Sequence, residues 1–242
     1  IYEGFRGIIE QNSVRADRTS VSEIIMRGGT VLKTARFPQF HDLNVVEKAA
    51  NVLKTHGINH LILIGGDGTY RGGYALSKFG INVIGIPATI DNDVMGTESS
   101  IGFDTALNTI TESVDKLRDT SRSHHRCSII EVMGNKCGDL ALYGGTACGV
   151  DLIISPEHHP SEQEIIDTLK NINLTHARHA LVLVSEKQFD DMNAFKNKII
   201  TETGFDTKLE VLGRVQRGGS PSATDRVLAS RFGVYALELI NA

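Results

Sequence analysis

The sequence has no tryptophan, only three cysteines in 242 residues, and no apolar run of the roughly 20 residues that would cross a bilayer. Cys127, Cys137 and Cys148 form an odd set without metal-site spacing, which favours free thiols in a reducing compartment over a disulfide framework. The N-terminal IYEGFRG has no signal-peptide pattern and no initiator methionine. We therefore expect a cytoplasmic protein and a sequence that is part of a longer chain.

An excess of positive charge is also lacking, since 25 Lys and Arg stand against 29 Asp and Glu and give a formal net charge of -4. Without a Lys/Arg-rich tail, no global field would hold nucleic acid, so local cations and backbone N–H groups must bind any anionic ligand. The charged fraction of 22% and the hydrophobic fraction of 40% are ordinary for a soluble globular protein. Neither nucleic acid nor a membrane is expected as a partner.

Short apolar runs bounded by Gly, Pro or Asp predict the strands of parallel sheets. Their near-continuous hydrophobicity is typical of strands that are covered on both faces. Helical patterns between them give the order strand, helix, strand, which predicts right-handed crossovers and doubly wound, mostly parallel α/β sheets. Ligands bind such sheets outside the carboxyl ends of the strands. The predicted strands are 60–66, 82–87, 127–134, 151–157 and 179–186.

The stretch IGGDGTYRGG directly follows the first predicted strand. Gly65, Gly66 and Gly68 would let backbone N–H groups approach a phosphate closely. Asp67 is suited to a divalent cation and Thr69 to a phosphate oxygen. The alternative is a tight strand-to-helix turn without a ligand. No Gly-Lys-Ser/Thr follows, which excludes a Walker A loop.

The stretch PATIDND follows the second predicted strand and contains Thr89, Asp91 and Asp93. Phosphoryl transfer to a hydroxyl requires one carboxylate that accepts the proton, another that helps to hold Mg²⁺, and a hydroxyl or N–H group near the transferring phosphoryl. These three residues supply that set. The alternative is an Asx-turn that closes the strand.

Arginines occur in three separate places, which suggests two phosphorylated ligands. Guanidinium groups match phosphate oxygens in bidentate geometry, although a single arginine is more often a solvated surface charge. Arg214 and Arg217 adjoin a Gly-Gly-Ser stretch that can present N–H groups to an anion. The other two candidates are Arg36 and Arg126.

Two further strand ends carry candidate sugar-binding residues. Glu186 ends the last predicted strand, where its carboxylate can accept hydrogen bonds from sugar hydroxyls, or can instead be a helix N-terminal charge. Met133 and Gly134 end the strand CSIIEVMG, and a methionine there is more commonly a core residue.

Six stretches occur in one order, GGDGT, PATIDND, IGFDTALNTI, RDTSRSHHR, EVMG and VLGRVQRGGSPSATDRVLASR. Together these motifs give the chain a clear resemblance to the bacterial ATP-dependent 6-phosphofructokinase family. The resemblance implies two doubly wound α/β domains with the active site in the cleft between them. It also implies transfer of a phosphoryl group from Mg-ATP to the 1-hydroxyl of fructose 6-phosphate, giving fructose 1,6-bisphosphate in glycolysis, by an allosteric cytoplasmic homotetramer.

The resemblance assigns catalytic and nucleotide-binding roles to individual residues. Asp91 would be the base that deprotonates the sugar hydroxyl, Thr89 would contact the transferring phosphoryl group, and Arg36 would bridge the two substrates. Asp67 and Asp93 would serve Mg²⁺. The nucleotide would meet Arg36, Phe37, Gly66, Gly68 and Thr69.

Fructose 6-phosphate would be held by a larger set. Within it, Arg126 would reach across from a neighbouring subunit. Arg214 and Lys208 stand where the family usually has His and Arg, and Asn135 stands where an arginine is common, so the hydrogen-bond geometry at the sugar phosphate differs. The whole set is Thr89, Asp91, Arg126, Met133, Gly134, Glu186, Lys208, Arg214 and Arg217.

The family's effector site is only partly matched. Its basic wall corresponds to Arg18, Ser22 and Arg118, with Asp151 in place of a glutamate. Two lysines expected before the strand at 179 are replaced, by Thr175 and Ala177.

By analogy, residues 1–102, completed by 216–242, form a nucleotide-binding domain, and 103–215 form a sugar-phosphate-binding domain. Family members begin with an earlier strand and a Gly-Gly-Asp loop and continue beyond Ala242.

The alternatives to an ATP-dependent enzyme are a pyrophosphate-dependent form, a lipid or NAD kinase, and a catalytically silent regulatory or binding paralogue. Gly68 favours ATP, because pyrophosphate-dependent relatives carry an aspartate there and a lysine at the position of Ala88.

Overall fold

A computed structural model describes residues 1–174 and 179–242, so Thr175 and Ala177 lie outside the described part of the chain. The chain divides into two compact units. Unit 1 contains residues 1–89, 94–102 and 219–242, and unit 2 contains residues 90–93 and 103–218. The assignment of one domain to the nucleotide and the other to the sugar stays a prediction.

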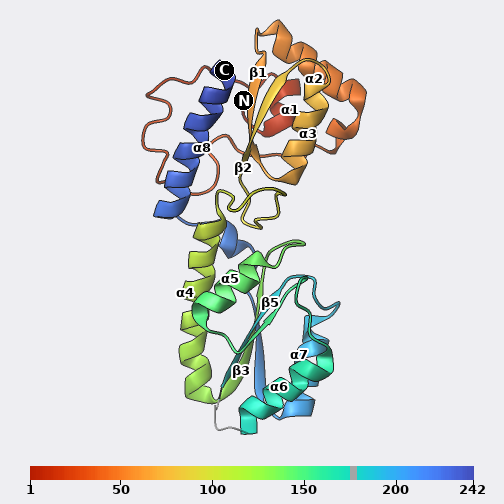
Figure 1. Ribbon diagram of the computed structural model, residues 1–242, viewed down its shortest axis with the longest axis vertical. Coiled ribbons are helices and arrows are strands. Elements are labelled where there is room, and N and C mark those ends of the chain that lie inside the picture. The colour runs from red at the N-terminus through yellow and green to blue at the C-terminus, as the bar shows by residue number, and fades with distance from the viewer. Residues whose placement is uncertain (175–178) are drawn as a thin grey trace. The chain divides into compact units, whose positions relative to one another are not determined.

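Unit 2 is built on a parallel sheet with the strand order β4-β5-β3-β6. Its strands are β3 (Arg126–Val132), β4 (Leu152–Ile154), β5 (Ala180–Ser185) and β6 (Asp206–Val211). Its helices are α4 (Phe103–His124), α5 (Asp139–Cys148), α6 (Glu162–Leu174), α7 (Met192–Thr203) and the 3₁₀ turn η2 (Gly213–Arg217). The predicted doubly wound parallel fold is confirmed (Figure 1).

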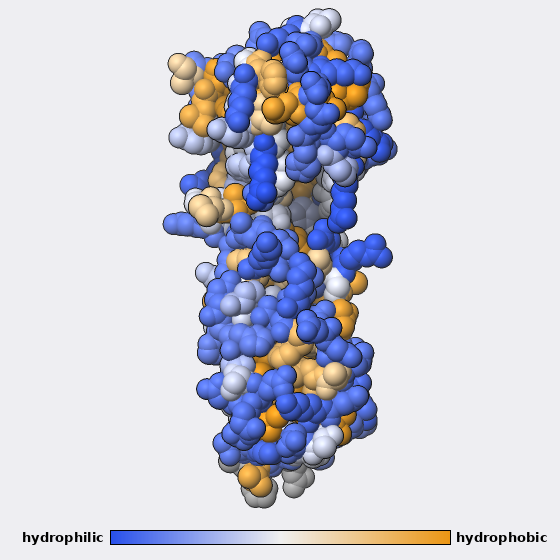
Figure 2. All heavy atoms as spheres, turned by 90° about the vertical axis from the view of Figure 1, so that its right-hand side faces the viewer, coloured by the Kyte–Doolittle hydropathy of each residue, from blue (hydrophilic) through white to orange (hydrophobic). Residues whose placement is uncertain are grey.

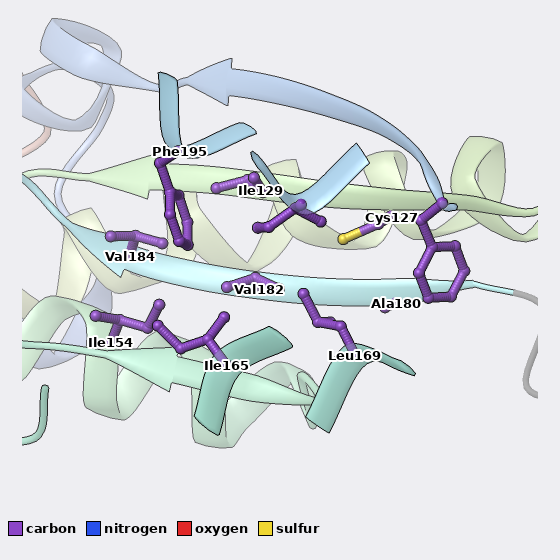
Figure 3. Close-up of a cluster of buried hydrophobic side chains, with 11 residues drawn as sticks. Cys127, Ile129, Ile154, Ile165, Leu169, Ala180, Val182, Val184 and Phe195 are labelled. Carbon is purple, nitrogen blue, oxygen red and sulfur yellow. The ribbon is translucent and has the colours of Figure 1, made fainter. Parts of the chain in front are cut away.

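Alternate residues of the central strands pack against helices on opposite faces of this sheet. Val182 and Val184 of β5 lie in one core with residues of α6 and α7, among them Ile165 and Phe195 (Figure 3). The neighbouring Leu183 lies in the other core, with α4 and α5. Every residue of β5 is buried, which confirms the prediction of strands covered on both faces.

After the two central strands of this sheet, β3 and β5, the chain continues to opposite faces of the sheet. The loop after β3 leads to α5, which packs in the core with α4, whereas the loop after β5 leads to α7 on the other face. Adjacent parallel strands whose connections diverge in this way form a topological switch point, where open α/β sheets bind ligands. The loops at 133–138 and 186–191 therefore lie where a ligand site is expected.

The edge strands of unit 2 differ from the sequence-based prediction. β4 ends at Ile154, short of the predicted 157, because Ser155 and His158 exchange backbone hydrogen bonds in a turn instead. β6 was not predicted. Only Thr207 within it is fully buried, so its sequence, DTKLEV, lacks the apolar run by which the inner strands were recognised.

Unit 1 contains the parallel pair β1 (His60–Gly65) and β2 (Asn82–Pro87). Leu61 and Val83 face a core formed with the helices before and after β1, whereas Ile64 is 58% exposed. The prediction of cover on both faces is thus wrong for β1, in which no residue is fully buried. The helices are α1 (Gly4–Ile9), η1 (Pro38–His41), α2 (Leu43–Thr55), α3 (Asp67–Ser77) and α8 (Ala223–Asn241).

The surface is mainly polar, with hydrophobic residues between polar ones on the face that Figure 2 shows. On α8 of unit 1, Val234, Tyr235 and Leu237 are among the exposed apolar residues. Within the described ranges, no helix is both long and apolar enough to cross a membrane.

Candidate active site

The loop after β3 is tied to η2 in unit 2. The backbone N–H of Met133 donates to Oε1 of Gln216 at 3.2 Å, and Nε of Arg217 lies 3.5 Å from Sδ of Met133. Gln216 is 1% exposed and its Nε2 also donates to the carbonyl of Gly213. This buried amide therefore fixes the turn that carries the two predicted arginines against the end of β3.

Arg214 and Arg217 lie three residues apart in η2 and are both exposed. Residues three apart are eclipsed in a 3₁₀ helix, so the two guanidinium groups project from the same face of the turn. Two adjacent cations of this kind are suited to a dianionic phosphate.

Glu186 lies at the end of β5, beside the loop that follows β3. Its backbone N–H donates to the carbonyl of Val132 at 2.7 Å, which extends the strand pairing by one residue. Its Oε1 accepts from the backbone N–H of Asn135 at 2.8 Å. The structure thus brings Glu186 beside the loop that carries Met133 and Gly134, and a sugar site at these strand ends stays a prediction.

The predicted base and its neighbour belong to unit 2 although they follow β2 of unit 1. Asp93 accepts a hydrogen bond from Nδ2 of Asn135 at 3.1 Å, which places it beside the β3 loop. Burial is the main reason why the pKa of Asp91 is raised, and the negative charge of Asp93 raises it further. The positive charges of Arg217 and Lys187 act to lower this pKa. A half-buried carboxylate with a raised pKa and cations nearby has the properties of a general base.

Arg126 and Lys208 lie at the other end of the same sheet. Arg126 begins β3 and Val132 ends it, so six residue steps, or about 20 Å of strand, separate the two residues. Arg126 and Lys208 both pair with Asp206, at 2.6 and 3.0 Å, and Arg126 foremost lowers the pKa of that carboxyl. The structure therefore does not bring these two cations together with Arg217 and Glu186 within one chain.

The glycine-rich motif of unit 1 forms the turn from β1 into α3. Asp67 is the first residue of α3, and Gly66 precedes it with an extended backbone. A Cβ on Gly66 would lie 3.6 Å from Cβ of Thr89, while a Cβ on Gly68 would have nothing within 4 Å. Thr69 and Thr89, both predicted to meet phosphoryl groups, thus lie around one glycine-lined helix start. Such a helix start presents N–H groups to an anion.

Asp67 already has a partner, because Nη2 of Arg71 lies 2.8 Å from its carboxylate across one turn of α3. Both side chains are exposed, so this pair contributes little to stability and can open. Mg²⁺ is held in such sites by one or two carboxylates together with substrate phosphates. An exposed aspartate beside a glycine-lined turn fits that chemistry, although no cluster of three metal-ligating side chains occurs in the described residues.

The remaining nucleotide candidates also belong to unit 1. Arg36 is exposed, and Phe37 precedes η1 with its ring centroid 6.2 Å from that of Phe40. The carbonyl of Thr89 accepts from the hydroxyl of Ser100 at 2.7 Å, which fixes the backbone there.

The predicted effector residues divide between the units. Arg18 and Ser22 are exposed in unit 1. In unit 2, Arg118 donates to the carbonyl of Cys148, and Asp151 accepts from the backbone N–H of Leu181 at 2.8 Å. Arg118 and Asp151 thus have structural partners, and an effector role for the set stays a prediction.

Two polar residues of the site were not predicted. Gln216 gave no signal, because a glutamine between two arginines is typical of a solvated turn and only the structure shows it buried. Lys187 adjoins Glu186 and could have been found from that position at a strand end.

Comparison with known proteins gives matches over nearly the whole chain. The family model described as phosphofructokinase matches residues 1–240. The chain is 48% identical to an ATP-dependent 6-phosphofructokinase of Vibrio cholerae over 240 residues, covering 99% of the chain and 75% of that protein. An ATP-dependent 6-phosphofructokinase 1 of Clostridium perfringens gives the same identity and coverage.

Two solved structures have the fold of this chain. A phosphofructokinase from Saccharomyces cerevisiae superposes with a TM-score of 0.89 at 31% identity, covering 99% of this chain and 37% of that one. A pyrophosphate-dependent phosphofructokinase from Marinobacter aquaeolei superposes with a TM-score of 0.83 at 23% identity, which shows a shared fold alone.

Proposed function

The chain belongs to the phosphofructokinase family, and on that premise we propose that it transfers a phosphoryl group from ATP to the 1-hydroxyl of fructose 6-phosphate, giving fructose 1,6-bisphosphate. The observation that carries the proposal is the group of residues at the switch point of unit 2. A half-buried carboxylate, Asp91, lies there among Glu186, Arg217 and Lys187. This set combines a proton acceptor, a sugar-hydroxyl acceptor and, in Arg217, a cation for a phosphate.

Unit 2 would bind and activate the acceptor. Arg214 and Arg217 would hold the 6-phosphate, Glu186 would accept from sugar hydroxyls, and Met133 and Gly134 would line the sugar. Asp91 would accept the proton of the 1-hydroxyl as that oxygen attacks the phosphoryl group.

Unit 1 would bind the donor. The start of α3, with Gly66, Gly68 and Thr69, would present N–H groups and a hydroxyl to the phosphates, and Arg36 and Phe37 would contact the nucleotide. Thr89 would contact the transferring phosphoryl group. Mg²⁺, held by Asp67 with Asp93 as an indirect partner, would neutralise phosphate charge.

We also propose a cytoplasmic homotetramer in which Arg126 and Lys208 serve the site of a neighbouring subunit. Their position supports this, because about 20 Å of strand separates Arg126 from the other sugar residues of its own unit. We further propose allosteric control through Arg18, Ser22, Arg118 and Asp151, the residues that match the family's effector site.

The test of the donor is a comparison of turnover by the full-length protein with ATP and with pyrophosphate. We expect faster turnover with ATP, because the space at Gly68 is open, whereas an aspartate there would repel a nucleotide's α-phosphate. Gly68→Asp should raise KM for ATP at least about tenfold, since a like charge brought close in a desolvated site costs more than 1 kcal/mol. Faster turnover with pyrophosphate would overturn the assignment of ATP, and no turnover with either would favour a silent paralogue.

Arg214→Ala tests the phosphate site on η2. We expect KM for fructose 6-phosphate to rise by about 10- to 100-fold and KM for ATP to stay within about twofold, since a charge-assisted hydrogen bond to phosphate is lost from one substrate only. Arg122→Ala, which removes an exposed arginine near the end of α4, is the matched control and should change neither constant. Equal effects of Arg214→Ala on both substrates would place Arg214 outside the sugar site.

A further inference from the structure

Asn135 makes three hydrogen bonds to three different side chains of unit 2. Its backbone N–H donates to Oε1 of Glu186 at 2.8 Å, and its Nδ2 donates to Oδ2 of Asp93 at 3.1 Å. Its Oδ1 accepts from Nζ of Lys187 at 2.9 Å. One residue thus links two carboxylates and one ammonium group at the switch point.

The chemistry of the amide explains why asparagine suits this position. An asparagine side chain has an acceptor oxygen and a donor nitrogen, so it can bind a cation and an anion at the same time. A carboxylate has no donor for Asp93, and a lysine or arginine has no acceptor for Lys187. The neutral amide therefore joins Asp93 to Lys187 without adding charge to the site.

The backbone of Asn135 also points to a defined role. Its φ of 57° lies in the left-handed region, as does the φ of 68° at Lys187. Asparagine tolerates this region better than most residues, whereas lysine does not share that preference. The hydrogen bond between their side chains joins two loops, each held in a left-handed turn just beyond adjacent strands β3 and β5.

We propose that Asn135 is a positioning residue, whose side chain orients Asp93 and whose backbone orients Glu186, and that Lys187 acts through it. The proposal rests on the proposed function, since it concerns the same acceptor site. Asn135 touches no reacting atom in this scheme. Its side chain would serve the step at Asp91 by fixing the adjacent Asp93, whereas its backbone N–H would serve sugar binding by fixing Glu186.

This division makes a specific prediction, because one substitution separates the two roles. Asn135→Gly removes the bonds to Asp93 and Lys187 but retains the backbone N–H to Glu186 and readily adopts a positive φ. We expect kcat to fall by about 10- to 100-fold, the effect of losing a hydrogen bond to a charged group. KM for fructose 6-phosphate should stay within about twofold, because the bond to Glu186 remains.

Two further variants of the full-length protein identify the partners of the amide. Asn135→Asp keeps the shape but places a carboxylate against Asp93, so kcat should fall at least as far as in Asn135→Gly. As a single substitution, Lys187→Met should lower kcat. In the Asn135→Gly background the same substitution should change kcat by less than about twofold, because the effects of two groups that act through one contact are not additive. Lys136→Ala, at the exposed next position, is the control and should behave as wild type.

Thermal melting of every variant distinguishes positioning from unfolding. Three outcomes would overturn the positioning role alone. They are an unchanged kcat in Asn135→Gly or Asn135→Asp, a fall in kcat that follows a fall in Tm, and additive effects of the Asn135 and Lys187 substitutions. A wild-type protein that phosphorylates fructose 6-phosphate with neither ATP nor pyrophosphate would overturn the proposed function, and with it this role.

Discussion

Asp91→Asn is expected to lower kcat by about 10²- to 10⁴-fold, the usual effect of losing a general base. The substitution keeps the size of the side chain and its ability to cap a turn, but an amide cannot accept the proton of the sugar hydroxyl. KM for fructose 6-phosphate should change little, because the proton moves only in the transition state. Tm should also change little, since burial already disfavours the charged form of this carboxyl.

Steady-state kinetics and thermal melting of the full-length variant decide this prediction. Asp119→Asn, on the exposed surface of α4, is the matched control and should retain wild-type kcat. If Asp91→Asn kept wild-type kcat, or lost activity only by unfolding, PATIDND would be a turn without a catalytic role, which is the alternative that its sequence allows.

Gly134→Ala is expected to disrupt the loop after β3 and to reduce kcat/KM for fructose 6-phosphate by more than about 10²-fold. The φ of Gly134 is +142°, and a Cβ would lie 2.4 Å from the carbonyl oxygen of Cys137 and 3.1 Å from Oγ of Ser185. The backbone must therefore shift, and Met133 and Asn135 shift with it. Strain of about 1–3 kcal/mol should lower Tm by roughly 2–12 °C.

Gly204→Ala is the control for the second prediction, because Gly204 also has a positive φ, +72°, but a Cβ there would meet nothing within 4 Å. It measures the conformational cost alone, at the end of α7. We expect it to lower Tm by a smaller amount and to leave KM for fructose 6-phosphate unchanged. Equal losses of activity in the two variants would show that Gly134 matters for stability and not for the shape of the sugar site.

The inner strands of the fold were predictable because burial on two faces leaves a continuous apolar run. β5 satisfies this condition at every residue, whereas β6, at the edge, buries only Thr207 completely and was missed. The exposure of Ile64 was unpredictable for the opposite reason, since an apolar strand residue does not show whether anything covers it. Sequence patterns thus report the environment of central strands better than that of edges.

The candidate site was predictable where residues follow a strand that the pattern had identified. Glu186, Met133 and Gly134 all end such strands, and the structure brings them together. Gln216 and the bonds of Asn135 were not predictable, because they depend on which loops meet in space. Comparison with the family pattern identified Asn135 only as a residue that differs from the usual arginine, and it did not predict the hydrogen bonds that Asn135 makes.

The divergence of the chain at the switch point gives the two walls of the proposed sugar site separate structural supports. The segment 133–138 continues into α5 and the segment 186–191 into α7, and these helices belong to separate cores on opposite faces of the sheet. A change of length or sequence in one loop therefore acts first on one core, and it reaches the other loop through the bonds that Asn135 makes to Glu186 and Lys187. Selection for a different phosphorylated acceptor could therefore alter one wall at a time. The hydrogen bond between the side chains of Asn135 and Lys187 joins the two walls, so such changes would have to retain it.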